Sequence, residues 1–309
     1  MRFDEVVSDI CVLGLGLIGG SLLRAAAAAG RNVFGYNRSV IDTTEFDVSA
    51  DLPQVLRRAR ETAALIVVAV PMPVVDTVFG AIATHAPNCP VTDVVSVKAP
   101  VAAAAAAHEL RFVGGHPMAG TAESGWEATD PTLFRGAVWV VACDDGTDPD
   151  TWTRVARLAL DVGAVVVPAE SGEHDRAVAR ISHLPHVLAE SLALSGAGGG
   201  ELALGLAAGS FRDGTRVAGT APALVRAMCE ANADALLAAL DETLDVLSHA
   251  RDALADGSLA DLVTAGHAAR RRYETVARWD ITGIAPGADG WLEALRDAGR
   301  RGGVLRALP

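Results

Sequence analysis

The fold of this chain is decided by the stretch Asp9-Ile10-Cys11-Val12-Leu13-Gly14-Leu15-Gly16-Leu17-Ile18-Gly19-Gly20-Ser21. Apolar residues 10–13 predict a buried strand, and the alanine-rich run that ends at Gly30 predicts a helix. Between them the glycines form the pattern G-x-G-x-x-G. Gly14 allows a tight turn, Gly16 leaves room for a pyrophosphate, and Gly19 lets helix and strand pack closely. We therefore predict a dinucleotide site with the phosphates at the helix N-terminus.

Strand and helix patterns alternate over the first half of the chain. Strands are expected at 32–36, 64–70, 91–95, 111–113, 137–142 and 164–167, and helices at 51–60, 74–85, 102–107 and 149–161, the last with Asp148 as N-cap. This alternation is typical of a doubly wound, mostly parallel sheet. From Glu170 onward the pattern is helical, with one long helix expected over 221–255. We predict an α/β Rossmann-type domain over 1–167, an all-α domain over 168–280 and a C-terminal tail over 281–309.

Composition limits the classes of function. With 309 residues, 50% of them hydrophobic, the chain can bury a large core. The net charge of −12 argues against nucleic acid as a partner, because no basic field would attract a phosphate backbone. The charged start is unlike a signal peptide, and the longest apolar run, 63–75, is too short to span a membrane. With no C-x-x-C pair among four cysteines, a cytoplasmic protein is expected.

The end of the second expected strand bears on the choice of cofactor. Sites for NAD usually carry an acid here that binds the ribose 2′-hydroxyl. This chain has Asn37-Arg38-Ser39, in which a cation and a hydroxyl could bind a 2′-phosphate. We therefore predict NADP+, or use of both NAD+ and NADP+. The alternative is that Arg38 is a solvated loop residue and that Asp42 or Asp47 supplies the acid.

Loops that follow the expected strands should face the ligand, because ligands bind at the carboxyl ends of the strands in such sheets. Val70 and Pro71 follow one strand, and Ser96 and Lys98 follow the next. His116 follows another, between a glycine and a proline, where an imidazole suits a general base. Taken alone, that histidine would be interpreted as a structural loop residue. The residues predicted to bind the cofactor are Gly14, Gly16, Leu17, Ile18, Gly19, Asn37, Arg38, Ser39, Val70, Pro71 and Lys98.

The helical part contains a polar helix face. Asp175, Ser182 and His186 are 7 and 4 residues apart, so they share one face at about 100° per residue. They mark either a kinked helix end near Pro185 or the wall of a polar pocket. The spacing His183-x-x-His186 also resembles a metal pair, but without cysteine ligands or an H-E-x-x-H motif we predict no metal site.

Two arginines precede the long helix. Arg212 or Arg216 could clamp a carboxylate, since a guanidinium pairs with it through two hydrogen bonds. The alternative is a salt bridge to Asp213, Glu201 or Asp175. The apolar faces of residues 236–247 and 259–267 exceed what one helix pair can cover, which predicts a homodimer interface.

Together these segments resemble the prephenate dehydrogenase family. The matching motifs, in the family's order, are Gly14 to Ser21, Asp93 to Lys98, Gly114 to Gly125, His174-Asp175, Ser182 to His186 and Phe211 to Val217. The resemblance implies a Rossmann-type domain followed by an all-helical dimerisation domain. It implies oxidative decarboxylation of prephenate to 4-hydroxyphenylpyruvate with NAD(P)+, in L-tyrosine biosynthesis.

The resemblance also implies roles for single residues. His116 matches the family's catalytic histidine, and Ser96 the serine near the substrate hydroxyl and the nicotinamide. Arg216 matches the arginine that binds a substrate carboxylate. The residues assigned with it to the substrate pocket are His186, Asp175, Ser182 and Gly209.

The chain departs from the family pattern in two places. Many relatives have a tryptophan where this chain has Val225, and NAD-specific relatives have an aspartate where it has Asn37. The segment after Asp280 has no room for a regulatory ACT domain, so any feedback by tyrosine is expected at the active site.

Three other functions are compared with prephenate dehydrogenation: a β-hydroxyacid dehydrogenase, an arogenate dehydrogenase and a non-catalytic nucleotide sensor. A β-hydroxyacid dehydrogenase would need a lysine in its helical domain, and no lysine follows Lys98. Arogenate differs from prephenate only in carrying an amine in place of the side-chain keto group, and it remains an alternative substrate. A non-catalytic nucleotide sensor is the alternative from another class, and the set His116, Ser96 and Arg216 argues against it.

Overall fold

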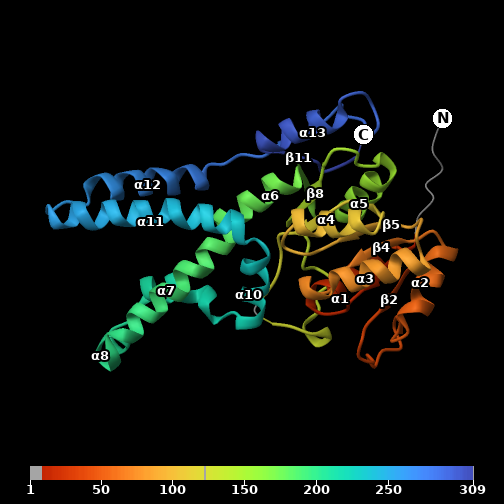
Figure 1. Cartoon of the computed structure of the whole chain (residues 1–309), viewed down its shortest axis with the longest axis horizontal. Coiled ribbons are helices and arrows are strands. Elements are labelled where there is room, and N and C mark those ends of the chain that lie inside the picture. Colours follow the sequence, from red (N-terminus) through yellow and green to blue (C-terminus); the bar gives the residue numbers. More distant parts are fainter. Residues whose placement is uncertain (1–8, 122, 309) are drawn as a thin grey trace. The chain divides into compact units, whose positions relative to one another are not determined.

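The computed structural model describes residues 9–121 and 123–308 and divides the chain into two compact units (Figure 1). The first unit contains the described residues up to His174 together with those from Asp280 onward. The second unit runs from Asp175 to Trp279 and is helical. No helix among the described residues is long and apolar enough to cross a membrane.

The first unit is built on a six-stranded parallel sheet in the order β3-β2-β1-β4-β5-β6. Its strands are β1 (Ile10–Leu13), β2 (Val33–Tyr36), β3 (Asp47–Ser49), β4 (Leu65–Val68), β5 (Pro90–Asp93) and β6 (Arg111–Phe112). β2 and β3 lie on one side of β1, and β4, β5 and β6 lie on the other. The strand order therefore reverses between β1 and β4, and the carboxyl ends of these two strands form the switch point where such sheets bind ligands. The predicted parallel, doubly wound sheet is confirmed.

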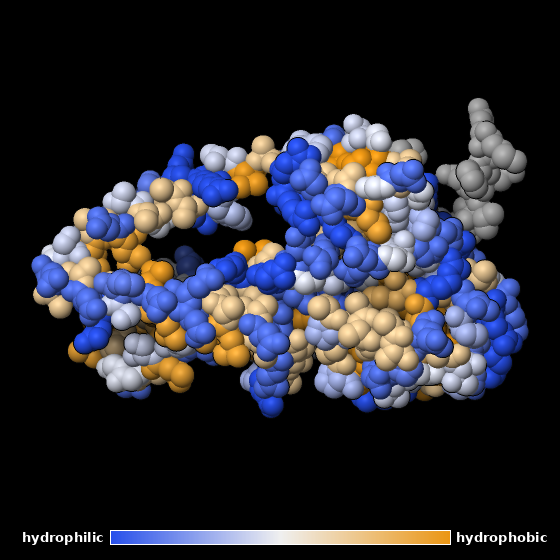
Figure 2. Space-filling model, turned by 45° about the horizontal axis from the view of Figure 1, so that its top comes forward, coloured by the Kyte–Doolittle hydropathy of each residue, from blue (hydrophilic) through white to orange (hydrophobic). Residues whose placement is uncertain are grey.

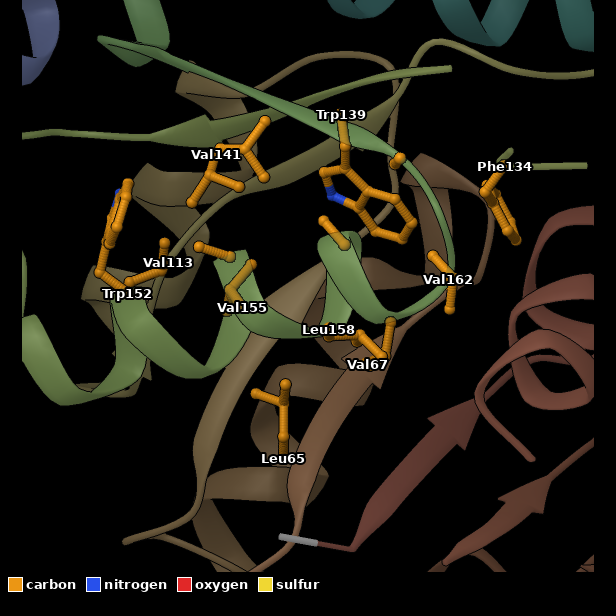
Figure 3. Close-up of a cluster of buried hydrophobic side chains, with 14 of the residues drawn as sticks. Leu65, Val67, Val113, Phe134, Trp139, Val141, Trp152, Val155, Leu158 and Val162 are labelled. Carbon is orange, nitrogen blue, oxygen red and sulfur yellow. The ribbon is translucent and has the colours of Figure 1, made fainter. Parts of the chain in front are cut away.

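Helices cover both faces of this sheet. They are α1 (Leu17–Ala28), α2 (Leu52–Glu61), α3 (Met72–His85), α4 (Ala99–Ala107) and α5 (Pro149–Asp161). Alternate side chains of the central strands, such as Val12 and Val67, join one buried cluster with α1 and α5. In Figure 3, Val67 of β4 lies beside Leu158 of α5, and Trp139 belongs to the same cluster. The core therefore fixes α1 against the strand that precedes the glycine-rich turn.

The residues after β6 form a second, three-stranded sheet that the sequence did not predict. It contains β7 (Gly115–Pro117), β8 (Val138–Ala142) and β9 (Val165–Ala169), with β7 antiparallel and β9 parallel to β8. A short 3₁₀ helix, η1 (Trp126–Ala128), lies between β7 and β8. His116 was expected in a loop, but it pairs with Val140 inside this sheet. Strand pairing gives its backbone a fixed position.

The predicted N-cap of α5 is confirmed. Asp148 accepts hydrogen bonds from the backbone N–H of Thr151 (2.8 Å) and from its hydroxyl (2.6 Å), and from Arg111 (2.8 Å). Partial burial opposes ionisation of Asp148, but these hydrogen bonds outweigh it and lower its pKa to about 2. The carboxylate therefore stabilises the folded state above about pH 4, the ordinary aspartate pKa, and this contribution is lost as the pH falls towards 2.

Replacing Asp148 with alanine should reduce the free energy of unfolding by about 1–2 kcal/mol at pH 7. The difference from the wild type should shrink between pH 4 and pH 2, as measured by urea unfolding at several pH values. Asp148→Asn is the matched control, since asparagine caps a helix without a charge. If the difference in free energy of unfolding between Asp148→Ala and the wild type did not change with pH, the charge of Asp148 would have no stabilising role.

The C-terminal segment, expected as a separate tail over 281–309, folds as part of the first unit. It contributes β10 (Trp279–Asp280), α13 (Trp291–Arg300) and β11 (Gly303–Val304). Helix α13 packs on β9 so closely that a Cβ on Gly299 would lie 2.0 Å from the carbonyl oxygen of Pro168. The ring of Trp291 packs against that of Trp152, with the two ring centroids 5.7 Å apart. Buried contacts of this kind are long-range in sequence, so local patterns did not reveal them.

The second unit consists of helices. Helix α6 (Ser171–Val178) enters it and is followed by a π-helical turn, η2 (Ala179–His183). The remaining helices are α7 (Leu184–Gly198), α8 (Gly200–Gly205), α9 (Gly209–Thr215), η3 (Arg216–Gly219), α10 (Pro222–Ala231), α11 (Ala233–Ala255) and α12 (Ala260–Glu274). The prediction of a single helix over 221–255 is therefore wrong, because the helix is interrupted at Asn232, between α10 and α11. Many apolar side chains of this unit lie on its surface, where orange is visible at the left of Figure 2.

Candidate active site

The glycine-rich turn has the shape that a dinucleotide requires. Gly14 has φ +97°, and a Cβ on it would lie 2.7 Å from the carbonyl oxygen of Ala69. A Cβ on Gly19 would lie 1.9 Å from the carbonyl oxygen of Gly14, so both positions need glycine. A Cβ on Gly16 would meet nothing within 4 Å, and α1 begins there without a side-chain cap. Open space beside uncapped N–H groups fits a pyrophosphate.

The predicted cofactor residues around this turn lie at the switch point. Leu17 and Ile18 form the first turn of α1 and are partly exposed. Val70 and Pro71 follow β4, and Val70 lies beside Gly14, with a side-chain carbon 3.0 Å from where a Cβ would stand. Leu17 and Ile18 thus directly follow Gly16, and Val70 lies against Gly14.

Asn37 is bound to the glycine-rich turn. Its Oδ1 accepts a hydrogen bond from the N–H of Leu15 (3.1 Å), and its Nδ2 donates to the carbonyl of Ser39 (2.8 Å). Arg38 is exposed and makes no hydrogen bond or ion pair with residues 9–121 or 123–308. Asp47, one of the acids considered as a ribose partner, forms a salt bridge with Arg58. A cation is therefore accessible at the end of β2, and the nearest strand-borne acid is engaged elsewhere.

Lys98 lies inside the first unit. Its side chain is fully buried and its ammonium pairs with Asp93 and donates to the carbonyl of Gly115 (2.8 Å). Asp93 also accepts from the N–H groups of Gly115 (3.1 Å) and Val95 (2.9 Å). This differs from the prediction that Lys98 contacts the cofactor. The lysine instead joins the end of β5 to the first residue of β7, next to His116.

Burial decides the electrostatics of this pair. Desolvation raises the pKa of the Asp93 carboxyl, while the Lys98 ammonium and the two backbone N–H groups lower it, and the net direction is upward. An ion pair in this position is retained only because its partners and hydrogen bonds compensate the loss of water. Ser96, in the same loop, is half-buried and therefore remains accessible to a ligand.

His116 projects from β7 and meets a second histidine. Its Nδ1 lies 2.8 Å from Nε2 of His174, and the two rings are nearly perpendicular, with centroids 5.1 Å apart. His174 is 3% exposed, whereas His116 is partly exposed. The motif His174-Asp175 carried part of the family resemblance, but no role for His174 was predicted from it.

The π-helical turn changes which residues share a face in the second unit. Asp175 and His183 are buried, at 5% and 0% exposure, whereas Ser182 is partly exposed. One π turn inserts an extra residue into the helix and rotates the residues after it. The prediction that Asp175, Ser182 and His186 share one α-helical face is therefore wrong, and His183 takes the buried position. Asn232 donates from Nδ2 to the carbonyl of Asp175 (2.8 Å) and contacts His183 Nδ1 (3.1 Å).

The remaining predicted substrate residues lie on α7, α9 and η3. His186 has a buried Nδ1 with no hydrogen-bond partner among the described residues. Gly209 begins α9, and Arg216 begins η3. Within the described ranges neither Arg216 nor Arg212 forms an ion pair, so the predicted alternative of a salt bridge to Asp213, Glu201 or Asp175 does not occur. Both exposed guanidinium groups are available to an anion.

Comparisons with known proteins agree with this arrangement. The model for the nucleotide-binding domain of prephenate dehydrogenase matches residues 26–168, and the model for its dimerization domain matches residues 170–265. The prephenate dehydrogenase of Bacillus subtilis is 30% identical over 252 residues, which are 77% of this chain and 68% of that protein. The chain belongs to the prephenate dehydrogenase family. It is therefore an oxidoreductase with a nucleotide-binding domain followed by a helical domain.

Solved structures of the prephenate dehydrogenase family have the same fold. A candidate prephenate dehydrogenase of Corynebacterium glutamicum is 50% identical, with a TM-score of 0.90 over 96% of this chain and 98% of that one. An arogenate dehydrogenase of Synechocystis is 29% identical, with a TM-score of 0.74 over 86% of this chain and 99% of that one. Proteins named for two different substrates are thus similar to this chain.

Proposed function

We propose that this protein is a prephenate dehydrogenase, which converts prephenate to 4-hydroxyphenylpyruvate and CO₂ with NAD+ or NADP+. The observation that carries the proposal is His116, a partly exposed imidazole fixed in a strand of the nucleotide-binding unit and bonded at Nδ1, so that Nε2 is the nitrogen proposed to act on the substrate. Family membership supplies the class of substrate. The pathway would be L-tyrosine biosynthesis, in the cytoplasm.

The chemistry requires a base, an electron acceptor and a grip on carboxylates. His116 takes the proton of the C4 hydroxyl through Nε2, and Ser96 positions the same hydroxyl. When bound, the nicotinamide accepts the hydride that leaves C4. Cleavage of the bond between C1 and its carboxylate releases CO₂, and its electron pair completes the aromatic ring. The C4 oxygen takes back the proton from His116, which gives the hydroxyl of 4-hydroxyphenylpyruvate and restores the neutral base. Aromatisation favours the products, so the protein's task is to position and deprotonate.

The second unit supplies the grip on the substrate in this proposal. Arg216 pairs with a substrate carboxylate, as its exposed guanidinium, which has no ion-pair partner among the residues that the structure describes, allows. His186, Asp175, Ser182 and Gly209 are proposed as pocket residues. The unit is also proposed to form a homodimer interface, since its family model is described as a dimerization domain and it exposes Leu237 (56%), Leu244 (53%) and Val263 (63%).

The test of the function is an assay of cofactor reduction in four pairings, prephenate or arogenate with NAD+ or NADP+. Turnover of prephenate at a higher kcat/KM than arogenate supports the proposal. A preference for arogenate would favour the activity of the Synechocystis relative. No reduction in any pairing would leave a nucleotide sensor as the better description.

Replacing Arg216 with alanine should raise the KM for the acid substrate by about 10–100-fold, the loss of one charge-assisted hydrogen-bonded pair. The affinity for the cofactor should not change. Arg212→Ala is the matched variant, because Arg212 lies four residues earlier and is equally unpaired among the residues that the structure describes. If Arg212→Ala raised KM and Arg216→Ala did not, the clamp would belong to Arg212.

Replacing Arg38 with alanine should weaken binding of NADP+ by about tenfold or more and leave NAD+ nearly unchanged, because only NADP+ carries the 2′-phosphate. Dissociation constants for both cofactors, measured by fluorescence titration, test this. Arg57→Ala, which removes another exposed arginine of the same unit, controls for a general effect of charge. Equal losses for both cofactors would refute a role for Arg38 in reading the 2′-phosphate.

A further inference from the structure

The hydrogen bond between His116 and His174 can run in either of two directions. A hydrogen bond between two ring nitrogens, here 2.8 Å apart, needs one proton between them. Either Nδ1–H of His116 donates to Nε2 of His174, or Nε2–H of His174 donates to Nδ1 of His116. Neutral imidazole carries one proton, so the direction fixes the state of the opposite nitrogen of His116.

Only the first direction leaves His116 able to act as a base. With the proton on Nδ1, Nε2 carries a lone pair and accepts the hydroxyl proton of the substrate. With the proton on Nε2, the histidine would present a donor to the substrate and could not take its proton. This step rests on the proposed function, in which His116 is the base.

His174 is held in place by the first unit. On α6, Ser171 donates to Asp144 through its hydroxyl (2.6 Å) and its N–H (2.8 Å). Glu173 accepts from Nε of Arg300 (2.7 Å), a residue of the C-terminal helix α13. The backbone N–H of His174 donates to the carbonyl of Glu170 (2.9 Å). These contacts fix the first turn of α6, and with it the buried ring that meets His116.

We propose that His174 is a positioning residue that accepts a hydrogen bond from Nδ1–H of His116 and holds it in the tautomer with a basic Nε2. The arrangement resembles the way an aspartate orients the histidine of a catalytic triad, but with a neutral acceptor. His174 is 3% exposed, so its hydrogen bond to His116 is shielded from water. When His116 takes the substrate proton, it alone becomes charged, and it keeps its hydrogen bond to His174.

Two substitutions separate the hydrogen bond from the packing. His174→Phe keeps a ring against His116 but has no acceptor, whereas His174→Gln keeps an acceptor oxygen without the ring. The phenylalanine variant should lose kcat by about 10–100-fold, the usual effect of removing an orienting partner, with little change in KM for the cofactor. The glutamine variant should retain most of the wild-type kcat. Equal losses in both variants, or none with phenylalanine, would overturn the inference.

A measurement on the unsubstituted protein is independent of folding in the variants. Nitrogen NMR of the protein labelled at histidine, with His116 assigned by comparison with His116→Asn, shows which ring nitrogen carries the proton. We expect protonated Nδ1 and unprotonated Nε2 in the neutral form, and the opposite tautomer would overturn the inference. If the wild type turned over neither substrate, the proposed function would fail, while the spectra would still decide the tautomer.

Discussion

Replacing His116 with asparagine should lower kcat by about 10²–10⁴-fold, the usual contribution of a positioned general base. Asparagine fits the site but cannot take a proton at neutral pH. Because the backbone of β7 is held by its pairing with β8, the cofactor site of the first unit should stay intact. The dissociation constant for the cofactor should therefore be unchanged, and the loss should appear in kcat.

The control for this substitution is His108→Asn. His108 lies at the end of α4, where its Nε2 pairs with Asp76 (2.9 Å), away from the strand that carries His116. The His108→Asn variant should turn over substrate with the kcat of the wild type. If His116→Asn kept a wild-type kcat in the same assay, another group would be the base.

Replacing Lys98 with methionine should destabilise the first unit by about 3–5 kcal/mol, because it leaves the buried carboxylate of Asp93 without its counter-charge. It should also lower activity, because Lys98 binds the carbonyl of Gly115, the neighbour of His116. Without the ammonium, the pKa of Asp93 is raised further above its value in the unfolded chain. The folded state then binds the extra proton, so the destabilisation should grow as the pH rises from 5 to 8.

Urea unfolding followed by tryptophan fluorescence measures this effect. Four of the five tryptophans, Trp126, Trp139, Trp152 and Trp291, lie in the first unit. Arg306→Met is the matched control, since it removes an exposed partner of Asp280 and should cost no more than about 1 kcal/mol. If Lys98→Met reduced the free energy of unfolding by no more than the control does, the buried pair would contribute little to folding.

The nucleotide-binding part was predictable because its signals are local. Strand, turn and helix follow one another within residues 10–28, and the structure reproduces the steric reasons for Gly14 and Gly19. The N-cap Asp148 was predictable for the same reason, because a cap acts on the next three residues. Among the candidate site residues, Val70, Pro71 and Ser96 followed from the rule for the carboxyl ends of parallel strands.

Other features depend on contacts that no short window contains. The sequence predicts that Lys98 is a polar loop residue beside a cofactor. In the structure it is buried, because Asp93 and Gly115 bind its ammonium. The π turn before α7 rotates the helix face that an α-helical period predicts. Just before that turn, the carbonyl of Asp175 accepts a hydrogen bond from Asn232, 57 residues away. The partner of His116 is 58 residues distant, and only its motif hinted at a role.

By itself the sequence determined the dinucleotide turn, the parallel sheet, the helical second part and the family, because these follow from periodicity, glycine geometry and ordered motifs. Only the tertiary structure decided where Lys98 points, which histidine meets His116 and that residues 281–309 complete the first unit. The physical reason is that burial and hydrogen bonding between distant segments set these features. A sequence pattern reports what a residue can do, whereas its packed neighbours decide which of those possibilities is used.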